Sequence, residues 1–199
     1  MLGTLRDNFA STVSKWHDRT AIIYEDREYS YGELNIRENR LANYLWDFGV
    51  RKGDVVGLLL YNCLEFAIGF LACQKLGAIS SCLNYRLSAA SIGHAVAQEK
   101  QKALIFNREF GAAVQEVMPG ARGCHFLCVG QPGYPWATSF DDVAGYPASA
   151  PPPVDIEETD TCNVIHTTGT TGRPKGAAFA NAGQIITGIQ YSLGMGLDR

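Results

Sequence analysis

The spacing of apolar residues changes several times along the chain, and each change marks a predicted element. The first apolar residues to recur at regular steps are Leu5, Phe9, Val13 and Trp16. Their steps of three and four residues predict an amphipathic helix. Two short apolar runs around residue 26 predict a hairpin. Ser30 and Glu33 then have the spacing of a capping box, which predicts a second helix that ends at Gly49.

Aliphatic runs alternate with helical periodicity from residue 54 onward. The predicted strands are 54–61, 78–83, 103–107 and 125–129, and the predicted helices are 64–76, 88–100 and 110–117. This alternation is typical of an α/β fold with a mainly parallel sheet and covering helices. The strands show little polar alternation, as expected when both faces of a sheet are buried. The predicted fold class is therefore α/β, with an additional amino-terminal hairpin.

A proline-rich segment interrupts the alternation. Residues 131–153 hold six of the eight prolines and no periodicity, so we interpret them as an ordered surface connection or linker. We therefore expect three parts: an α/β amino-terminal subdomain at 1–130, the connection at 131–153, and a strand, loop, strand and helix at 154–199. A helix is predicted over 181–197, although four glycines weaken it.

Charge and hydropathy limit the classes of partner. The formal net charge of −3 argues against nucleic-acid binding by a broad basic face. The amino terminus lacks the apolar centre of a signal peptide. The most apolar region, 55–83, is interrupted by Asn62, Glu65, Gln74 and Lys75 and falls short of the roughly 20 apolar residues that span a bilayer. We expect a cytoplasmic protein with no membrane span.

Two groups of residues have side chains of types that bind metals. The six cysteines form no C-x-x-C pair, and reduced thiols are expected. Cys124, His125 and Cys128 resemble half of a metal site, but their strand-like surroundings favour buried thiols. The acidic residues are Asp155, Glu157, Glu158 and Asp160. They lack a framing motif, so we interpret them as a solvated approach to the next strand and predict no metal ligand.

The segment from His166 to Gly176, reading HTTGTTGRPKG, has the composition of a phosphate-binding loop. Glycines let the main chain approach closely and adopt positive φ, so that successive N–H groups can converge on an anion. Hydroxyl groups add donors, and cations strengthen hydrogen bonds to phosphate oxygens. The residues assigned to phosphate contacts are Thr167, Thr168, Gly169, Thr170, Thr171, Gly172 and Lys175.

This loop differs from the P-loop of common nucleotide triphosphatases. Pro174 stands where that pattern has glycine, and Lys175 is followed by Gly176 rather than by Ser or Thr. The flanking residues, 163–167 and 177–180, have the pattern of strands. The contribution of a helix dipole to phosphate binding, which a P-loop followed by a helix provides, is therefore not expected here. An ordinary Gly/Thr hairpin is the alternative interpretation, but the full string favours a phosphate site.

HTTGTTGRPKG resembles the phosphate-loop signature of the ANL superfamily of adenylate-forming enzymes, which includes acyl-CoA synthetases, luciferases and adenylation domains of peptide synthetases. Residues 28–87 are similar to the amino-terminal part of acyl-CoA ligases, and Asn84-Tyr85-Arg86-Leu87 resembles that branch most. The resemblance implies the first part of the large amino-terminal domain of an AMP-forming ligase. It also implies ATP, Mg²⁺, coenzyme A and a carboxylate as substrates. A fatty acid is expected, with an aryl or short-chain acid left open.

The resemblance implies a reaction in two steps. A carboxylate attacks the α-phosphate of ATP and releases pyrophosphate, and the thiol of coenzyme A then displaces AMP. The loop would hold the pyrophosphate leaving group, with Lys175 as an electrostatic helper.

Several motifs of the superfamily do not occur in these residues: those for adenine, ribose and magnesium, the hinge, and the carboxy-terminal lysine. Ala180-Asn181 also replaces the usual Thr-His or Ser-His pair. We therefore expect no catalytic residue within the chain, which alone would be inactive. We expect an amino-terminal fragment of a ligase, with the missing part possible as a separate chain. The alternative is a non-catalytic nucleotide-binding or partner-docking module.

Overall fold

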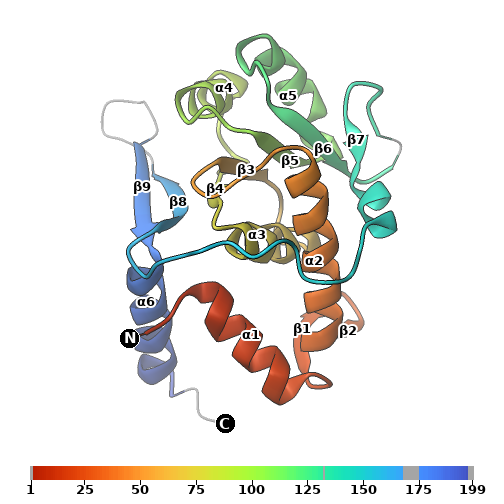
Figure 1. The fold of residues 1–199 in the computed structure, drawn as a ribbon. Helices are drawn as coiled ribbons and strands as arrows, with labels where there is room; N and C mark the ends of the chain where they lie inside the picture. The colour runs from red at the N-terminus through yellow and green to blue at the C-terminus, as the bar shows by residue number, and fades with distance from the viewer. Residues whose placement is uncertain (1, 132, 168–174, 197–199) are drawn as a thin grey trace.

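The computed structural model describes residues 2–131, 133–167 and 175–196. Figure 1 shows their elements, most of which belong to one seven-stranded sheet and its covering helices. The strands of this sheet are β3 (Val55–Leu59), β4 (Ile79–Cys82), β5 (Ala103–Asn107), β6 (His125–Val129), β7 (Thr138–Ser139), β8 (Thr161–Thr167) and β9 (Lys175–Ala180). Their order is β7-β6-β5-β3-β4-β8-β9, and every neighbouring pair is parallel except β8 and β9.

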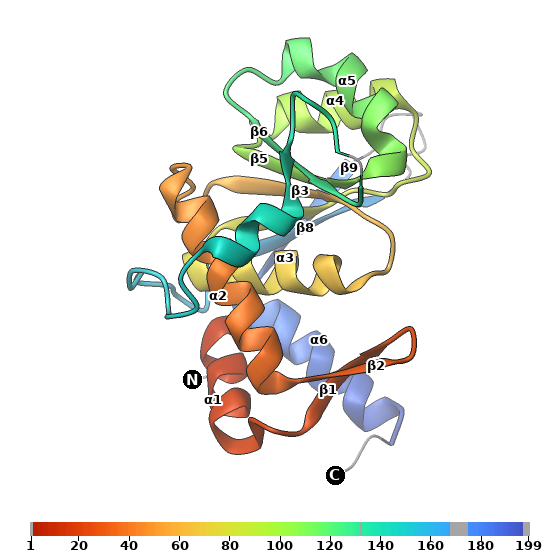
Figure 2. The same ribbon diagram turned by 90° about the vertical axis from the view of Figure 1, so that its right-hand side faces the viewer.

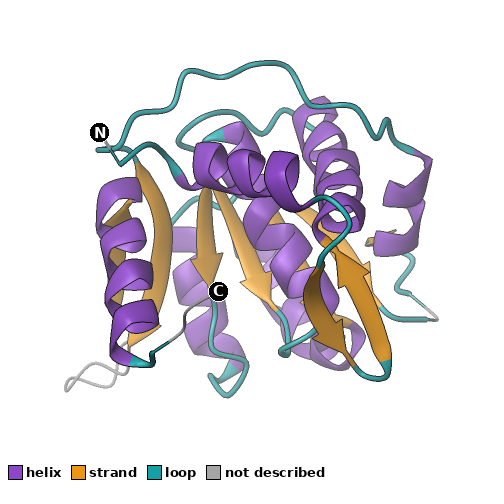
Figure 3. Cartoon of the chain, turned by 90° about the horizontal axis from the view of Figure 1, so that it is seen from below, coloured by secondary structure: helices purple, strands orange, loops and turns teal. Residues whose placement is uncertain are grey.

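Two helical layers cover the sheet, one on each face (Figures 2 and 3). The first layer contains α2 (Tyr31–Asp47) and α3 (Leu64–Leu76), and the second contains α4 (Ala89–Gln98) and α5 (Gly111–Val117). Successive residues of β5 face the two layers in turn: Ile105 packs with α2 and α3, whereas Leu104 and Phe106 pack with α4 and α5. All five residues of β5 are buried, which confirms the prediction of strands buried on both faces.

The amino-terminal elements lie beyond the α2 and α3 layer. They are α1 (Leu5–Trp16) and the antiparallel hairpin of β1 (Thr20–Tyr24) and β2 (Arg27–Ser30). The predicted capping box is present: the Ser30 hydroxyl accepts a hydrogen bond from the Glu33 N–H, and the Glu33 carboxylate accepts one from the Ser30 N–H. The mixed α/β class and the amino-terminal hairpin are thus confirmed.

The proline-rich connection contributes to the sheet, which its sequence did not predict. Within it, β7 pairs with β6 and forms one edge of the sheet, and a 3₁₀-helix, η3 (Phe140–Gly145), lies against α2. The Asn39 and Asn43 side chains of α2 donate hydrogen bonds to carbonyl oxygens of residues 147–149. Since β8 pairs with β4, residues 1–130 and 154–199 share one sheet. The division into subdomains remains a prediction.

Helix α6 (Asn181–Gly194) follows β9 and closes the described part of the chain. It ends three residues before the predicted end of this helix at residue 197, which lies outside the described residues. Short 3₁₀ turns, η1 (Arg108–Phe110) and η2 (Met118–Gly120), flank α5. None of the helices described here has the length and hydropathy needed to cross a membrane.

Candidate functional site

The predicted phosphate loop joins the two antiparallel strands at one edge of the sheet. Thr167 is the last residue of β8 and pairs with Lys175, the first residue of β9, whose side chain is exposed. Five of the predicted site residues lie outside the described residues: Thr168, Gly169, Thr170, Thr171 and Gly172. The structure therefore places the two ends of the loop opposite each other. The expected strands on both sides of the loop are present, and β8 begins two residues earlier than predicted.

Buried polar contacts fix β8 in the sheet before it reaches the loop. The Ser80 hydroxyl of β4 donates to the Cys162 carbonyl at 3.1 Å, and its Oγ lies 3.2 Å from Asn163 Oδ1. Gln74 of α3 donates a further hydrogen bond to the Cys162 carbonyl at 3.3 Å. All four residues are buried, and a buried polar group without a partner is costly. These contacts therefore oppose a shift in the register between β4 and β8.

A second polar cluster lies directly at the root of the loop. His166 Nε2 is 2.8 Å from Glu99 Oε1 and 3.1 Å from Ser81 Oγ, and the His166 and Glu99 side chains are only 5% and 15% exposed. Gln101 Nε2 donates to the other carboxylate oxygen of Glu99 at 2.7 Å. Burial alone would raise the pKa of Glu99. Hydrogen bonds from His166, Gln101 and Ser81 outweigh burial and hold this pKa below its ordinary value.

Gly176 allows this cluster to lie against the hairpin. It pairs with His166 across the two strands, and a Cβ at Gly176 would lie 2.9 Å from Cγ1 of Val164 and 3.8 Å from Oε1 of Glu99. A contact under 3 Å would force a neighbouring group to move. A cavity of about 240 Å³ opens beside the cluster, between α4 and the hairpin. The last glycine of the loop motif thus has a steric role that its sequence did not reveal.

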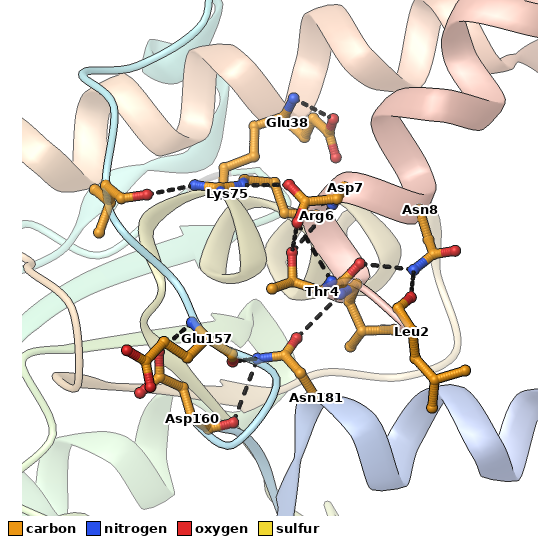
Figure 4. Close-up of polar contacts among 12 residues, drawn as sticks. Leu2, Thr4, Arg6, Asp7, Asn8, Glu38, Lys75, Glu157, Asp160 and Asn181 are labelled. Carbon is orange, nitrogen blue, oxygen red and sulfur yellow. Dashed lines mark hydrogen bonds and ion pairs between the residues drawn. The ribbon is translucent and has the colours of Figure 1, made fainter.

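Asn181 directly follows β9, at the opposite end of that strand from the loop. Figure 4 shows its side chain beside Glu157 and Asp160 of the turn before β8. Its side chain is buried and accepts a hydrogen bond from the Leu5 N–H at 3.0 Å. Its amide nitrogen lies 3.3–3.4 Å from the carbonyl oxygens of Asp160 and Glu157, as their hydrogen-bond donor. Asn181 therefore joins the start of α1 and the start of α6 to the turn before β8. At this position, where the resembling enzymes often have histidine, the side chain has a structural role.

Two carboxylates of the acidic stretch also have structural partners. Asp160 Oδ2 accepts from the Glu157 N–H at 2.7 Å and lies 2.7 Å from Lys52 Nζ. Glu158 accepts a hydrogen bond from the Gly3 N–H at 2.7 Å. Both carboxylates are partly exposed and, beyond the predicted solvated approach to the strand, tie the turn to distant segments. The described residues contain no cluster of three or more potential ligands suited to a metal ion.

Cys128 of β6 and Cys124, which directly precedes this strand, pack on the side of the sheet that faces α4 and α5. Burial raises the pKa of Cys124 to about 12 and also raises that of Cys128. His125 lies instead against the α2 side, where its ring stacks on Phe48 at 3.6 Å between centroids and contacts the Tyr44 hydroxyl. All six cysteines are free. The absence of a metal at these residues remains a prediction.

Sequence reasoning did not find Glu99 and Ser81. Neither belongs to a recognisable motif, and the contact with His166 depends on the pairing of β4 with β8 and on the position of α4. The only available signal was the position of His166 at the start of the loop string.

Comparisons with known proteins agree with this architecture. A family model described as AMP-binding enzyme matches residues 9–196. A 2-succinylbenzoate-CoA ligase from Bacillus licheniformis is 32% identical over 184 residues, which cover 91% of this chain and 35% of that ligase. A medium/long-chain-fatty-acid-CoA/3-oxocholest-4-en-26-oate-CoA ligase from Mycobacterium marinum is 33% identical over 171 residues, which cover 81% of this chain and 31% of that ligase.

A solved structure gives the same match in three dimensions. The crystal structure of an anthranilate CoA ligase in complex with anthranoyl-AMP superposes with a TM-score of 0.85 and 25% identity, over 90% of this chain and 35% of that chain. The chain therefore spans about a third of the length of the relatives that it matches.

Proposed function

Because the chain belongs to the family of AMP-binding enzymes, we propose that it supplies the phosphate-binding amino-terminal part of an AMP-forming acid-CoA ligase. One observation carries this proposal: the string HTTGTTGRPKG spans the connection between β8 and β9 at the edge of a sheet that superposes on an anthranilate CoA ligase. The relatives described above are themselves CoA ligases.

The proposed reaction has two steps. A carboxylate oxygen attacks the α-phosphorus of ATP, which enters as its Mg²⁺ complex, and the bond to the bridging oxygen of the β-phosphate breaks. The products are acyl-AMP and pyrophosphate. The sulfur of coenzyme A then attacks the acyl carbon, loses its proton and displaces AMP.

The loop's role in the first step is to bind the leaving group. Negative charge moves onto pyrophosphate as the bond breaks, so hydrogen-bond donors directed at the β- and γ-phosphates stabilise the transition state more than the substrate. We assign these contacts to Thr167, Thr168, Gly169, Thr170, Thr171 and Gly172. Lys175 adds positive charge at the exit of the loop and moves no proton.

For the carboxylic acid substrate, only a chemical class is proposed. The relatives take their names from an aromatic dicarboxylate, from fatty acids and from anthranilate. We propose a fatty acid as the first substrate to test and an aryl acid as the second.

The experiment measures binding of magnesium pyrophosphate to the 199-residue chain by ³¹P NMR titration. Each charge-assisted hydrogen bond contributes about 1.5–3 kcal/mol, but ordering a glycine-rich loop and the ligand opposes this gain. We therefore expect a dissociation constant of about 1 mM or weaker. Gly172→Val, which restricts the backbone of the loop, should weaken binding at least tenfold.

Gly120→Val is the matched control, because a Cβ at Gly120 meets no atom within 4 Å and its φ is not positive. This variant should bind pyrophosphate as the wild-type chain does. Equal affinity of the Gly172→Val and wild-type chains would contradict the assignment of the loop.

A non-catalytic docking module is the second candidate, and the exposed apolar face of α6 favours it. Three apolar residues at steps of three and four, Ile186, Ile189 and Leu193, lie on one side of this helix and are 45%, 47% and 77% exposed. A contiguous exposed apolar surface often marks an interaction site. For such a module we expect association through α6 without measurable pyrophosphate binding, which separates the two candidates.

A further inference from the structure

Glu99 connects three elements at the root of the phosphate loop. It is the carboxy-terminal cap residue of α4, and its carboxylate lies 2.8 Å from His166 Nε2 of β8. Ser81 of β4 adjoins the same imidazole nitrogen at 3.1 Å. A helix end and two strands therefore meet at one carboxylate, although nothing in the sequence links these residues.

Both oxygens of the Glu99 carboxylate are engaged. His166 contacts Oε1, and Gln101 donates to Oε2 at 2.7 Å. Since the imidazole Nε2 lies against an ionised acceptor, it carries the proton of this hydrogen bond. Nδ1 of His166 is buried and has no hydrogen-bond partner among the residues that the structure describes, so the ring is held through Nε2.

The position of His166 transmits this contact to the loop. His166 directly precedes Thr167 in β8 and pairs with Gly176, which directly follows Lys175 in β9. Glu99 therefore contacts the strand pair formed by His166 and Gly176, which lies next to both ends of the loop. A glycine-rich segment loses conformational entropy when it binds an anion, and fixing its ends reduces that loss.

We propose that Glu99 is a positioning residue for phosphate binding, which acts through His166 and fixes both ends of the loop. This inference rests on the proposed function, because it assigns the loop to phosphate. Glu99 contacts no substrate in this scheme, and its effect is on the geometry of Thr167 and Lys175. Gly176 belongs to the same arrangement, since a larger residue would collide with Val164 beside the cluster.

The test compares magnesium pyrophosphate affinity, by ³¹P NMR titration, for four forms of the 199-residue chain. We expect Glu99→Ala to raise the dissociation constant about tenfold relative to wild type. Glu99→Gln keeps an oxygen acceptor for His166 and should rescue binding to within about threefold of wild type. Glu116→Ala is the matched control, since Glu116 is an exposed acidic residue on α5 and should leave affinity unchanged.

A second measurement reports the contact itself. The ¹⁵N signals of the His166 imidazole should shift in Glu99→Ala, remain close to wild type in Glu99→Gln and be unchanged in Glu116→Ala. A purely structural role for Glu99 elsewhere in α4 would not move these signals. If the alanine variant does not fold, Glu99→Asp, which withdraws the carboxylate by one methylene group, should weaken binding and shift the signals in the same direction.

The outcomes separate the two proposals. A wild-type chain that binds pyrophosphate and a folded Glu99→Ala or Glu99→Asp variant that binds it equally well would overturn the positioning role alone. A wild-type chain that shows no pyrophosphate binding would overturn the proposed function, and the positioning role with it.

Discussion

Similar apolar residues occur at the centre of the sheet and at the edge formed by β8 and β9 with the following helix α6. Their environments in these two regions differ strongly. In β5 all five residues are buried, whereas in α6 Asn181 is the one buried residue of the helix. Leu104 is fully buried, while Leu193 is 77% exposed. The difference shows that apolar periodicity identifies a face suited to burial but not the partner that covers it.

The two regions also use charge differently. Glu38 of α2 and Lys75 of α3 form an ion pair at 2.8 Å, with side chains 1% and 12% exposed. Lys52 and Asp160 form a pair of nearly the same length, 2.7 Å, near the turn before β8, but with side chains 39% and 26% exposed. Exposed pairs contribute about 0–1 kcal/mol, so pH should affect folding through the buried pair more strongly.

The largest expected effect is a loss of stability at the centre of the sheet. Phe106 is fully buried and its ring lies 5.5 Å from that of Trp136 in a stacked arrangement. Phe106→Ala should lower the free energy of unfolding by about 3–5 kcal/mol, because it removes buried surface and leaves a cavity. Leu193→Ala should change it by less than about 0.5 kcal/mol. Urea unfolding followed by circular dichroism measures both, and similar losses in the two variants would refute the comparison.

An intermediate effect is expected from pH. Burial raises the pKa of Glu38 to about 7, against an unfolded value of 4.5, although Lys75 partly offsets this effect. The folded state therefore favours the protonated carboxyl group. Its contribution to stability is complete below pH 4.5 and is lost as pH rises through 7. One pKa unit corresponds to about 1.4 kcal/mol, so the loss is at most about 3–4 kcal/mol.

Glu38→Gln isolates this contribution. Other carboxylates, including those of Asp7, Glu99 and Asp160, have lowered pKa values and make the fold less stable at low pH. The difference in unfolding free energy between wild type and Glu38→Gln removes their common effect. Between pH 4.5 and 7 this difference should fall as pH rises, and a difference independent of pH would contradict the assignment.

Local patterns predicted most of the fold because they act within single elements. The α3 helix and the β5 strand have the predicted bounds, Leu64–Leu76 and Ala103–Asn107, since an apolar run specifies each and Gly77 ends the helix. The two-residue strand β7 and η3 were missed, because such short elements carry no period. They form in the structure through contacts with β6 and α2.

The candidate site could be predicted only where its residues are adjacent in the sequence. The loop string predicts a phosphate site between Thr167 and Lys175, and the structure describes the two ends of that segment. Glu99 and Ser81 could not be found, because their meeting with His166 depends on the order of β4 and β8 in the sheet. That order results from packing over the whole domain, which no local sequence pattern contains.

The smallest expected change in stability comes from substitutions on the exposed face of α6. They test most directly the contrast between this helix and the buried centre of the sheet. Ile189 and Leu193 lie four residues apart, on one face of the helix, and are 47% and 77% exposed. Apolar side chains that stay in water in one copy can be buried between two copies, so we expect the chain to self-associate. Ile189→Glu with Leu193→Glu should abolish this association, which sedimentation velocity measures over a range of concentrations.

The matched control is Ile23→Glu, since Ile23 is 69% exposed but lies in β1, away from α6. It should leave self-association unchanged. The double α6 variant should keep the monomer's unfolding free energy within about 0.5 kcal/mol of wild type, as expected for exposed positions. If the control reduced association as much as the α6 variant, general surface hydropathy rather than α6 would be responsible. If the α6 variant instead lost several kcal/mol of stability, its apolar face would have a partner within the chain, and the contrast between the two regions would fail.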